Sequence, residues 1–167
     1  EVVHSTVMGL GERAGNAATE DTVMALLTMY GLDIGLKYDK LYPLAKLVQE
    51  ISGVQVPSNR AIVGDQLFQV ESGIIANWFK NCGVEHQTEL FPFRPELVGQ
   101  PAATVVMGKG SGIDSVKIWL DQIGAEATDE QAREILMECK ALGGSSKKLL
   151  TIDQFKVIAE KTLSNVA

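Results

Sequence analysis

Apolar residues recur along the first third of the chain at the spacings of one strand and two helices. Residues 2–8 are almost entirely apolar, which is typical of a parallel strand covered on both faces. Residues 19–30 carry apolar side chains three and four positions apart, and two acidic residues in the first turn suit the helix dipole. The same period continues from Leu41 until Gly53. The pattern therefore predicts a strand followed by two helices.

The middle of the chain is less regular. Residues 65–81 predict one or two short helices broken at Gly73, because a glycine interrupts an otherwise helical pattern. Residues 91–101 contain three prolines and no sustained period. We therefore expect this Pro-rich segment to be the internal linker between two subdomains.

The last third predicts a small, mostly helical module. Residues 104–108 form a short apolar run typical of a strand, and the next helical face ends at Gly124. A further helix is expected to end at Gly143. Two capping boxes, each a Thr with a Gln three residues later, predict the starts of the last two helices at Thr128 with Gln131 and Thr151 with Gln154. The charges around residues 129–134 predict a solvated helix face.

Composition narrows the class of protein. The 167 residues are 46% hydrophobic and 22% charged, which is ordinary for a soluble, cytoplasmic protein of one or two small domains. A net charge of -6 gives no electrostatic basis for binding nucleic acid or anionic membranes, and no run approaches the roughly 20 apolar residues of a membrane helix. Cys82 and Cys139 are far apart and lack zinc-ligand spacing, so both are expected to be core thiols.

The junction between the predicted strand and the first helix combines glycines with polar residues. It has the sequence GLGERAGNAATED, residues 9–21. Glycines permit backbone conformations closed to other residues, and loops at the carboxyl ends of parallel strands surround substrate pockets in α/β proteins. From the residues alone, a tight turn with a capping Asn16 is an equally good interpretation.

Three segments in order resemble one enzyme superfamily. GLGERAGNAATED resembles the GxGERxGN loop after the last barrel strand of the isopropylmalate synthase, homocitrate synthase and hydroxymethylglutaryl-CoA lyase superfamily. AIVGDQLFQVESGIIANWFKN, residues 61–81, is similar to the block that follows the barrel in the synthases. TVVMGKGSGIDSV, residues 104–116, is similar to their GKxSG block.

The resemblance implies a fold that is mainly α with minor β. Residues 1–31 would be the final strand-helix unit of a (β/α)8 TIM-type barrel, followed by helical subdomain I at 32–98 and subdomain II, small and mostly helical, at 99–167. A whole barrel needs roughly 250 residues. We therefore expect the C-terminal part of such an enzyme, either as a fragment or as a separately encoded subunit.

The resemblance also implies site residues. The superfamily holds a divalent ion (Mg, Mn or Zn) with an Asp, a His-x-His pair and the Asn of this loop, and only Asn16 is present here. Glu12 and Arg13 are candidates for catalysis, although they could equally pair with each other. Lys109 and Ser111 are candidates for binding a phosphate or a cofactor, or for contacting the opposite subunit. His4, on the predicted strand, is expected to be packed and hydrogen-bonded.

The chain departs from the synthases at three positions. Val70, Ile75 and Gly110 stand where the synthases carry histidines, one of which is proposed to assist proton transfer in the partner subunit's site. A condensation needs a base to form the enolate of acetyl-CoA. Either another residue supplies this base, or the reaction differs.

The resemblance implies condensation of acetyl-CoA with a 2-oxo acid through an enolate. One alternative is a related lyase or aldolase that cleaves a 2-oxo or 3-hydroxy acid. The other is a non-catalytic interaction subunit that completes a barrel. The expected partners are the rest of the barrel, in the same or a separate chain, a second copy of the protein, and the small oxo acid, with no nucleic acid and no membrane.

Overall fold

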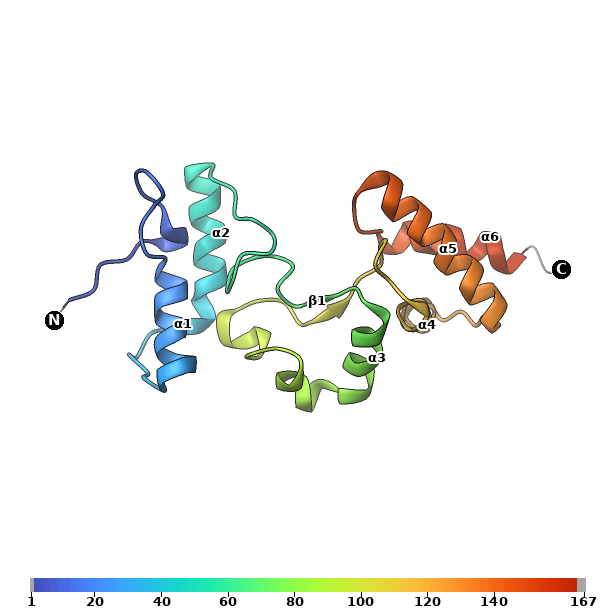
Figure 1. Ribbon diagram of the computed structural model, residues 1–167, viewed down its shortest axis with the longest axis horizontal. Helices are drawn as coiled ribbons and strands as arrows, with labels where there is room; N and C mark the ends of the chain where they lie inside the picture. Colours follow the sequence, from blue (N-terminus) through green and yellow to red (C-terminus); the bar gives the residue numbers. More distant parts are fainter. Residues whose placement is uncertain (1, 165–167) are drawn as a thin grey trace. The chain divides into compact units, whose positions relative to one another are not determined.

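The computed structural model describes residues 2–164 and groups the chain into two compact units (Figure 1). Unit 1 contains Glu1–Phe68 and Phe91–Ala102, and unit 2 contains Gln69–Leu90 and Ala103–Ala167. The chain therefore passes between the units after residues 68, 90 and 102. This division differs from the ranges 1–31, 32–98 and 99–167 expected from the sequence.

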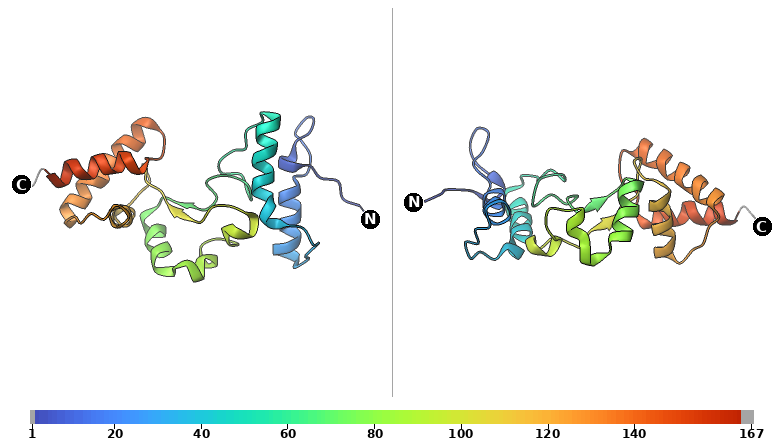
Figure 2. Two further views of the ribbon diagram at one scale, coloured as in Figure 1. Left: turned by 180° about the vertical axis from the view of Figure 1, so that it is seen from behind. Right: turned by 60° about the horizontal axis from the view of Figure 1, so that its bottom comes forward.

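Unit 1 is built on two helices that run alongside each other (Figures 1 and 2). Helix α1 ends before Gly31 and helix α2 before Gly53, and both glycines adopt left-handed conformations, with φ of 66° and 71°. Both predicted helices are thus confirmed. The elements of this unit are η1 (Val7–Gly9), α1 (Thr19–Tyr30), η2 (Tyr38–Lys40), α2 (Leu41–Ser52) and η4 (Pro95–Val98), where η marks a 3-10 helix.

The strand predicted over residues 2–8 is not formed. Its described residues make only one isolated bridge, between Thr6 and Ala18, and Val7–Gly9 turns into η1. Val2 and Val3 are 80% and 75% exposed. The reason is that a strand covered on both faces needs neighbouring strands, and none of the described residues supplies one.

The Pro-rich segment 91–101 packs into unit 1, so the prediction of a linker there is wrong. Phe91 and Phe93 meet Phe68 edge to face, with ring centroids 5.3 and 5.7 Å apart. Val98 is fully buried. The prolines therefore shape a packed return of the chain, ending in η4, instead of separating two subdomains.

Unit 2 joins a two-stranded parallel sheet to a helical module. Gln69 pairs with Thr104 and Val70 with Val105, so of the strand predicted over residues 104–108 only the first two residues form one. Helix α3 begins at Gly73. The prediction that residues 65–72 are also helical is wrong. The elements are β1 (Gln69–Val70), α3 (Gly73–Cys82), η3 (Val84–Glu89), β2 (Thr104–Val105), α4 (Ile113–Ile123), α5 (Asp129–Ser146) and α6 (Ile152–Ser164).

The core of unit 2 lies between α4, α5 and α6. Trp119 meets Phe155 edge to face at 5.2 Å, and its Nε1–H donates to the carbonyl of Val105 at 2.8 Å. Ile135 and Cys139 of α5 are fully buried in the same cluster. The predicted burial of the Cys139 thiol is thereby confirmed, whereas Cys82 is only half-buried.

Helix α5 starts where the sequence predicts and ends later. Its capping box is complete: the amide of Gln131 donates to Thr128 Oγ1 at 3.2 Å, and the amide of Thr128 donates to Gln131 Oε1 at 2.8 Å. The helix continues past Gly143 to Ser146. Gly143 therefore does not end the helix. Its lack of a side chain instead admits the backbone of Lys109, because a Cβ there would lie 2.9 Å from the amide nitrogen of Lys109.

Candidate functional site

The loop between η1 and α1 is closed at its neck by backbone hydrogen bonds. The amide of Thr6 donates to the carbonyl of Ala17 at 3.0 Å, and the amide of Thr19 donates to the carbonyl of Thr6 at 2.9 Å. Further out, the amide of Asn16 donates to the carbonyl of Gly9 at 2.9 Å. The residues predicted as a strand-to-helix loop therefore form a folded loop that begins and ends at one place.

Two glycines make this compact loop possible. Gly9 and Gly15 have φ of 67° and 93°, in or near the left-handed region that glycine adopts without cost. A Cβ on Gly15 would lie 2.5 Å from the carbonyl oxygen of Gly9, which no side chain could tolerate. The glycine-rich pattern is thus explained by a close approach of two backbone segments.

The side-chain amide of Asn16 is oriented by the loop itself. Its Nδ2 donates to the carbonyl of Leu10 at 3.3 Å, which leaves Oδ1 as an acceptor without a partner among the described residues. A Cβ on Gly11 would lie 2.5 Å from Nδ2, so the amide fits only beside a glycine. The side chain is exposed, and it borders a hollow of about 390 Å³ lined by His4, Ser5, Thr6, Asn16 and Ala17.

The donor set fits one ligand of a divalent ion. An amide oxygen is a neutral, hard donor suited to magnesium, manganese or zinc beside charged ligands. Within residues 2–164 there is no group of three His, Cys, Asp or Glu side chains that could complete a site. Asn16 could therefore contribute to a metal site whose other ligands come from outside the described residues.

His4 is exposed, which corrects the expectation that it is packed within a strand. It lies on the wall of the same hollow as Asn16. The alternation of residues along the predicted strand could not indicate that His4 is exposed, because His4 lies outside any helix or strand of the structure.

Glu12 and Arg13 form an ion pair at the tip of the loop, with Arg13 Nη1 2.9 Å from Glu12 Oε2. Their side chains are 87% and 81% exposed, so water screens the pair and its contribution to stability is about 0–1 kcal/mol. The pairing considered from the sequence is thus present. The exposed Arg13 guanidinium could exchange this partner for the carboxylate of an acid ligand.

The second candidate loop, GKGSG, is held from inside unit 2. Ser111 is 1% exposed, and its hydroxyl accepts the amide of Gly108 at 2.9 Å. The amide of Gly110 donates to Glu71 Oε1 at 2.7 Å. Ser111 therefore serves the loop, and of the two candidates for a phosphate contact only Lys109 is exposed.

The residues at the three positions without histidine cannot themselves carry a proton. Val70 is buried in β1, and Ile75 lies half-buried on α3. At Gly110 a Cβ would lie 3.1 Å from the Glu71 carboxyl carbon, so Glu71 occupies the space beside the missing side chain. An acid is thus the titratable group found there.

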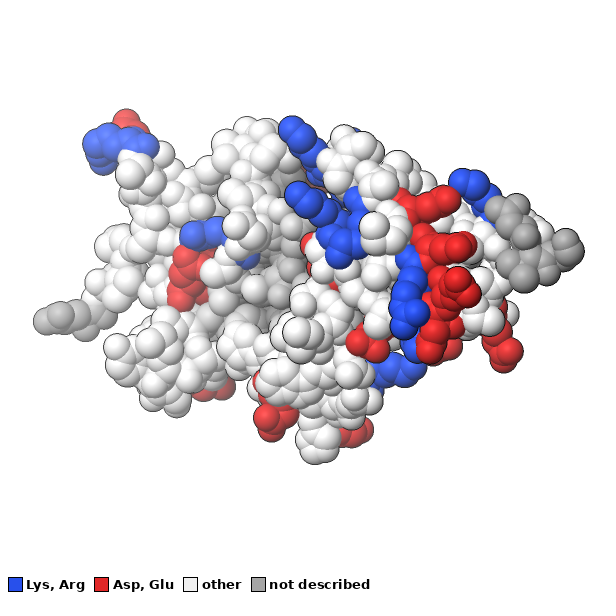
Figure 3. Space-filling view, turned by 45° about the vertical axis from the view of Figure 1, so that its right-hand side comes forward, with Lys and Arg blue, Asp and Glu red and all other residues white. Residues whose placement is uncertain are grey.

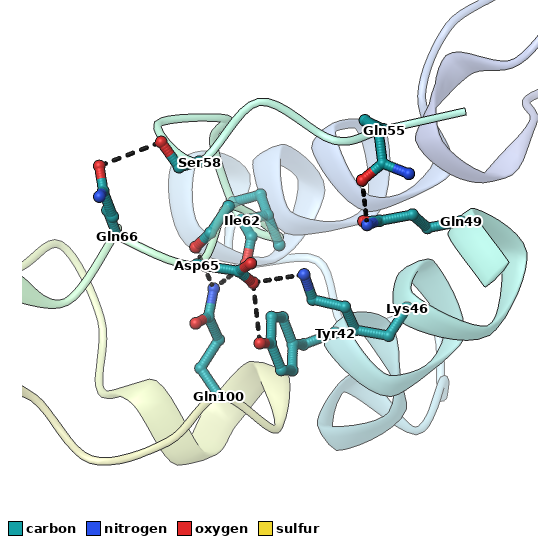
Figure 4. Close-up of polar contacts among 10 residues, drawn as sticks. Tyr42, Lys46, Gln49, Gln55, Ser58, Ile62, Asp65, Gln66 and Gln100 are labelled. Carbon is teal, nitrogen blue, oxygen red and sulfur yellow. Dashed lines mark hydrogen bonds and ion pairs between the residues drawn. The ribbon is translucent and has the colours of Figure 1, made fainter. Parts of the chain in front are cut away.

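A second polar cluster joins α2 to the loop that follows it (Figure 4). Tyr42 donates its hydroxyl to Asp65 Oδ1 at 2.9 Å, and Lys46 forms an ion pair with the same oxygen. Burial and the hydrogen bond to Asp65 raise the pKa of Tyr42 to about 12. Desolvation alone would raise the pKa of Asp65, but the hydrogen bonds from Lys46 and Tyr42 outweigh it and lower that pKa.

The charged surface of unit 2 is mixed in sign. Figure 3 shows basic and acidic side chains next to one another on this face. Lys117 pairs with Asp129 at 2.9 Å, and Glu130 and Arg133 are exposed. The prediction of a solvated face around residues 129–134 is confirmed.

Among residues 2–164, no helix has the length and apolar character needed to span a bilayer.

Comparison with known proteins places the chain in a family. The model of the homocitrate synthase post-HMGL domain-like family matches residues 62–147, and the HMGL-like model matches residues 1–48. The first match covers more than half of the chain. The protein therefore belongs to the homocitrate synthase post-HMGL domain-like family, within the isopropylmalate synthase, homocitrate synthase and hydroxymethylglutaryl-CoA lyase superfamily.

The relatives are synthases by name. A putative (R)-citramalate synthase CimA of Methanopyrus kandleri is 41% identical over 165 residues, which cover 99% of this chain and 31% of the relative. The (R)-citramalate synthase CimA of Methanocaldococcus jannaschii is 38% identical over 95% of this chain and 31% of its own length. A 2-isopropylmalate synthase of Sulfurisphaera tokodaii is 40% identical over 97% and 40%. The chain thus spans about a third of the length of these relatives.

Proposed function

We propose that this chain belongs to a metal-dependent synthase that condenses acetyl-CoA with a 2-oxo acid. In this proposal residues 1–31 complete a TIM-type barrel, whose remaining strands are in the same or a separate chain. The observation that carries it is the Asn16 amide, whose Oδ1 is left free beside a hollow in the loop that this family places at the barrel's active end. We call the chain together with the rest of the barrel the assembled enzyme.

Asn16 would hold the divalent ion together with ligands from the rest of the barrel. When bound, the ion would supply Lewis-acid polarisation of the oxo acid's carbonyl group. Arg13 would bind the carboxylate of the oxo acid, because a guanidinium matches a carboxylate with two parallel hydrogen bonds. Glu12 would hold the guanidinium in place before the acid arrives, as it does in the present ion pair.

Exposed apolar side chains on unit 1 support the proposed partners. Burying apolar surface is favourable by about 25 cal/mol per Å², so a partner that covered these side chains would be stabilised by their burial. A barrel would cover the start of the chain, and a second copy could cover part of the helical region. The exposed large apolar residues of this unit are Val2, Val3, Met29, Tyr30, Leu32, Ile34, Leu36, Leu44, Leu47, Ile51 and Val54.

One observation favours a lyase as the second candidate. Condensation in the synthases uses histidines from this region, and Val70, Ile75 and Gly110 cannot transfer protons. Cleavage of a 3-hydroxy acid by related enolate chemistry would need fewer groups from this region. Glu71, beside Gly110, is the group that would have to replace a histidine if the enzyme is a synthase.

The test is a thiol-release assay on the assembled enzyme. Acetyl-CoA is supplied with 2-oxo acids of increasing side-chain length, starting from pyruvate, with and without divalent metal. Metal-dependent release of free CoA thiol that requires the oxo acid supports the synthase. Release of pyruvate from a hydroxy acid, or of acetyl-CoA from a 3-hydroxyacyl-CoA thioester, without condensation, supports the lyase. If this chain associates with the rest of the barrel and neither reaction is seen, both the synthase and the lyase proposals are contradicted, and a non-catalytic subunit is the remaining interpretation.

A further inference from the structure

Glu20, the second residue of α1, is a buried acid that the proposed chemistry does not use. It is 2% exposed, and its Oε2 accepts the amide of Met8 at 3.0 Å. Its other oxygen, Oε1, is buried without a partner among the described residues. A carboxylate is kept inside a protein only where it makes a hydrogen bond that the fold needs. The contact with Met8 is therefore the one to explain.

Met8 is the residue at which the backbone turns into the glycine-rich loop. It has φ of 60° and ψ of 10°, a left-handed conformation that costs energy in any residue with a side chain. The next residue, Gly9, accepts the amide of Asn16 through its carbonyl at 2.9 Å. The turn at Met8 thus sets the direction of the carbonyl on which Asn16 is anchored.

A loop from later in the chain lines the space beside Glu20. Glu20 and Met8 border a cavity of about 60 Å³, whose other walls include Val54, Val56 and Val63. Because Glu20 is only 2% exposed, the hydrogen bond from Met8 is stronger than it would be on the surface.

The covering loop, residues 54–66, is itself fixed at several points (Figure 4). Its contacts to the helices and to the Pro-rich segment hold it over the N-terminal end of α1. They are the ion pair of Arg60 with Asp21, the hydrogen bond of Tyr42 to Asp65 at 2.9 Å, that of Gln49 to Gln55 at 2.8 Å, and those of Gln100 Nε2 to the carbonyls of Ile62 and Gly64, both at 3.0 Å.

We propose that Glu20 is a positioning residue for the metal-ligand loop. Its carboxylate holds the amide of Met8, the turn at Met8 orients Gly9, and Gly9 anchors Asn16 so that Oδ1 borders the hollow. The role toward the metal rests on the proposed function of Asn16, whereas the control of the loop conformation does not.

Two substitutions separate the reach of the side chain from its charge. Glu20→Asp keeps the charge but shortens the side chain by one methylene, so it cannot reach Met8. Glu20→Gln removes the charge and keeps an oxygen at full length. The matched control is Glu50→Asp, which makes the same shortening at an exposed position of α2 in the same unit.

Hydrogen exchange of the peptide covering residues 9–16, measured on the 167-residue chain, is the first readout. Loss of the bond to Met8 should speed exchange about tenfold in Glu20→Asp, since breaking a buried hydrogen bond has that order of effect. Trypsin cleavage after the exposed Arg13 should accelerate in parallel. Glu20→Gln and Glu50→Asp should exchange within about twofold of the unchanged chain. Unchanged exchange in Glu20→Asp would overturn the proposal.

Metal affinity of the assembled enzyme is the second readout. Glu20→Asp should raise the metal Kd about tenfold, as loss of an outer-shell contact does, and Glu20→Gln should restore it. At saturating metal the KM for the oxo acid should be unchanged. If Glu20→Asp loosens the loop but leaves the metal Kd unchanged while Asn16→Ala raises it, the positioning role is wrong. If Asn16→Ala itself leaves the Kd unchanged, the proposed function fails and the effect of Glu20 on the loop stands.

Discussion

Gly11→Ala should move the Asn16 amide while leaving the fold intact. The added Cβ would lie 2.5 Å from Asn16 Nδ2 and 2.8 Å from Cγ, both in a side chain that can rotate away. Gly11 is not in the left-handed region, so alanine is not strained there by its backbone conformation. The cost is the hydrogen bond from Asn16 to Leu10, about 0.5–1.5 kcal/mol. It is partly offset by about 0.4–1 kcal/mol from the stiffer unfolded chain.

The functional effect of Gly11→Ala should be larger than its effect on stability. Outer-shell changes typically weaken metal binding by about 10–100-fold, or about 1.4–2.7 kcal/mol. We expect a loss of this size when the assembled enzyme is titrated with manganese by calorimetry, with a change in the free energy of unfolding below about 1 kcal/mol. The control is Gly144→Ala, where a Cβ meets nothing within 4 Å. Wild-type manganese affinity in Gly11→Ala would refute this account of how Asn16 is oriented.

Three further predictions concern unit 2 and α2. Gly144→Ala should stabilise the chain by about 0.5–1 kcal/mol through helix propensity, whereas Gly143→Ala should destabilise it by about 1–2 kcal/mol because its Cβ meets backbone. Urea denaturation followed by tryptophan fluorescence measures both changes in the free energy of unfolding. Changes of the same sign would contradict the packing described for Gly143. Burial raises the pKa of the Cys139 thiol to about 12, so a thiol reagent should label Cys82 quickly and Cys139 only as fast as the unit opens; Cys82→Ala should remove the fast phase. Burial, and then Asp65, raise the pKa of Tyr42 to about 12. Tyr42 should therefore stabilise the fold below its ordinary pKa of about 10, and this stability should be lost as the pH rises through about 12. Tyr42→Phe should remove the last step of the absorbance titration at alkaline pH.

Helix boundaries and caps are predictable from the sequence because their causes are local. Gly31, Gly53 and Gly124 end helices in left-handed conformations, which only neighbouring residues need to favour. The capping box at Thr128 depends on one side chain three residues away. Such features follow from a short stretch of sequence.

Features that depend on distant parts of the chain could not be predicted in this way. The apolar run 2–8 indicates a strand, but pairing requires neighbours that residues 2–164 do not supply. Gly143 resembles a helix terminator, yet its role is to admit the backbone of Lys109. Glu20 fits the helix dipole in the first turn, and its burial arises only when the later loop 54–66 covers it.

In the candidate site, too, some features follow from the local sequence and others depend on distant parts of the chain. The motif predicts Asn16 as a ligand, and the amide orientation that suits this role comes from hydrogen bonds within the same loop. Ser111 was a candidate from its motif, but it is buried in contacts with residues far away in the sequence: it forms an isolated bridge with Ser72, and its carbonyl accepts a hydrogen bond from Lys140. A motif thus identifies the loop, and only the packing distinguishes the residues that face outward from those that hold it together.

The most direct test of the central claim is the metal affinity of Asn16→Ala in the assembled enzyme. Calorimetric titration with manganese should give a Kd at least about tenfold higher than that of the unchanged enzyme, because one of the expected ligands is lost. The activity lost at limiting metal should return in part at high metal concentration. A Kd and a rate at limiting metal equal to those of the unchanged enzyme would remove Asn16 from the site and contradict the proposed role of this loop.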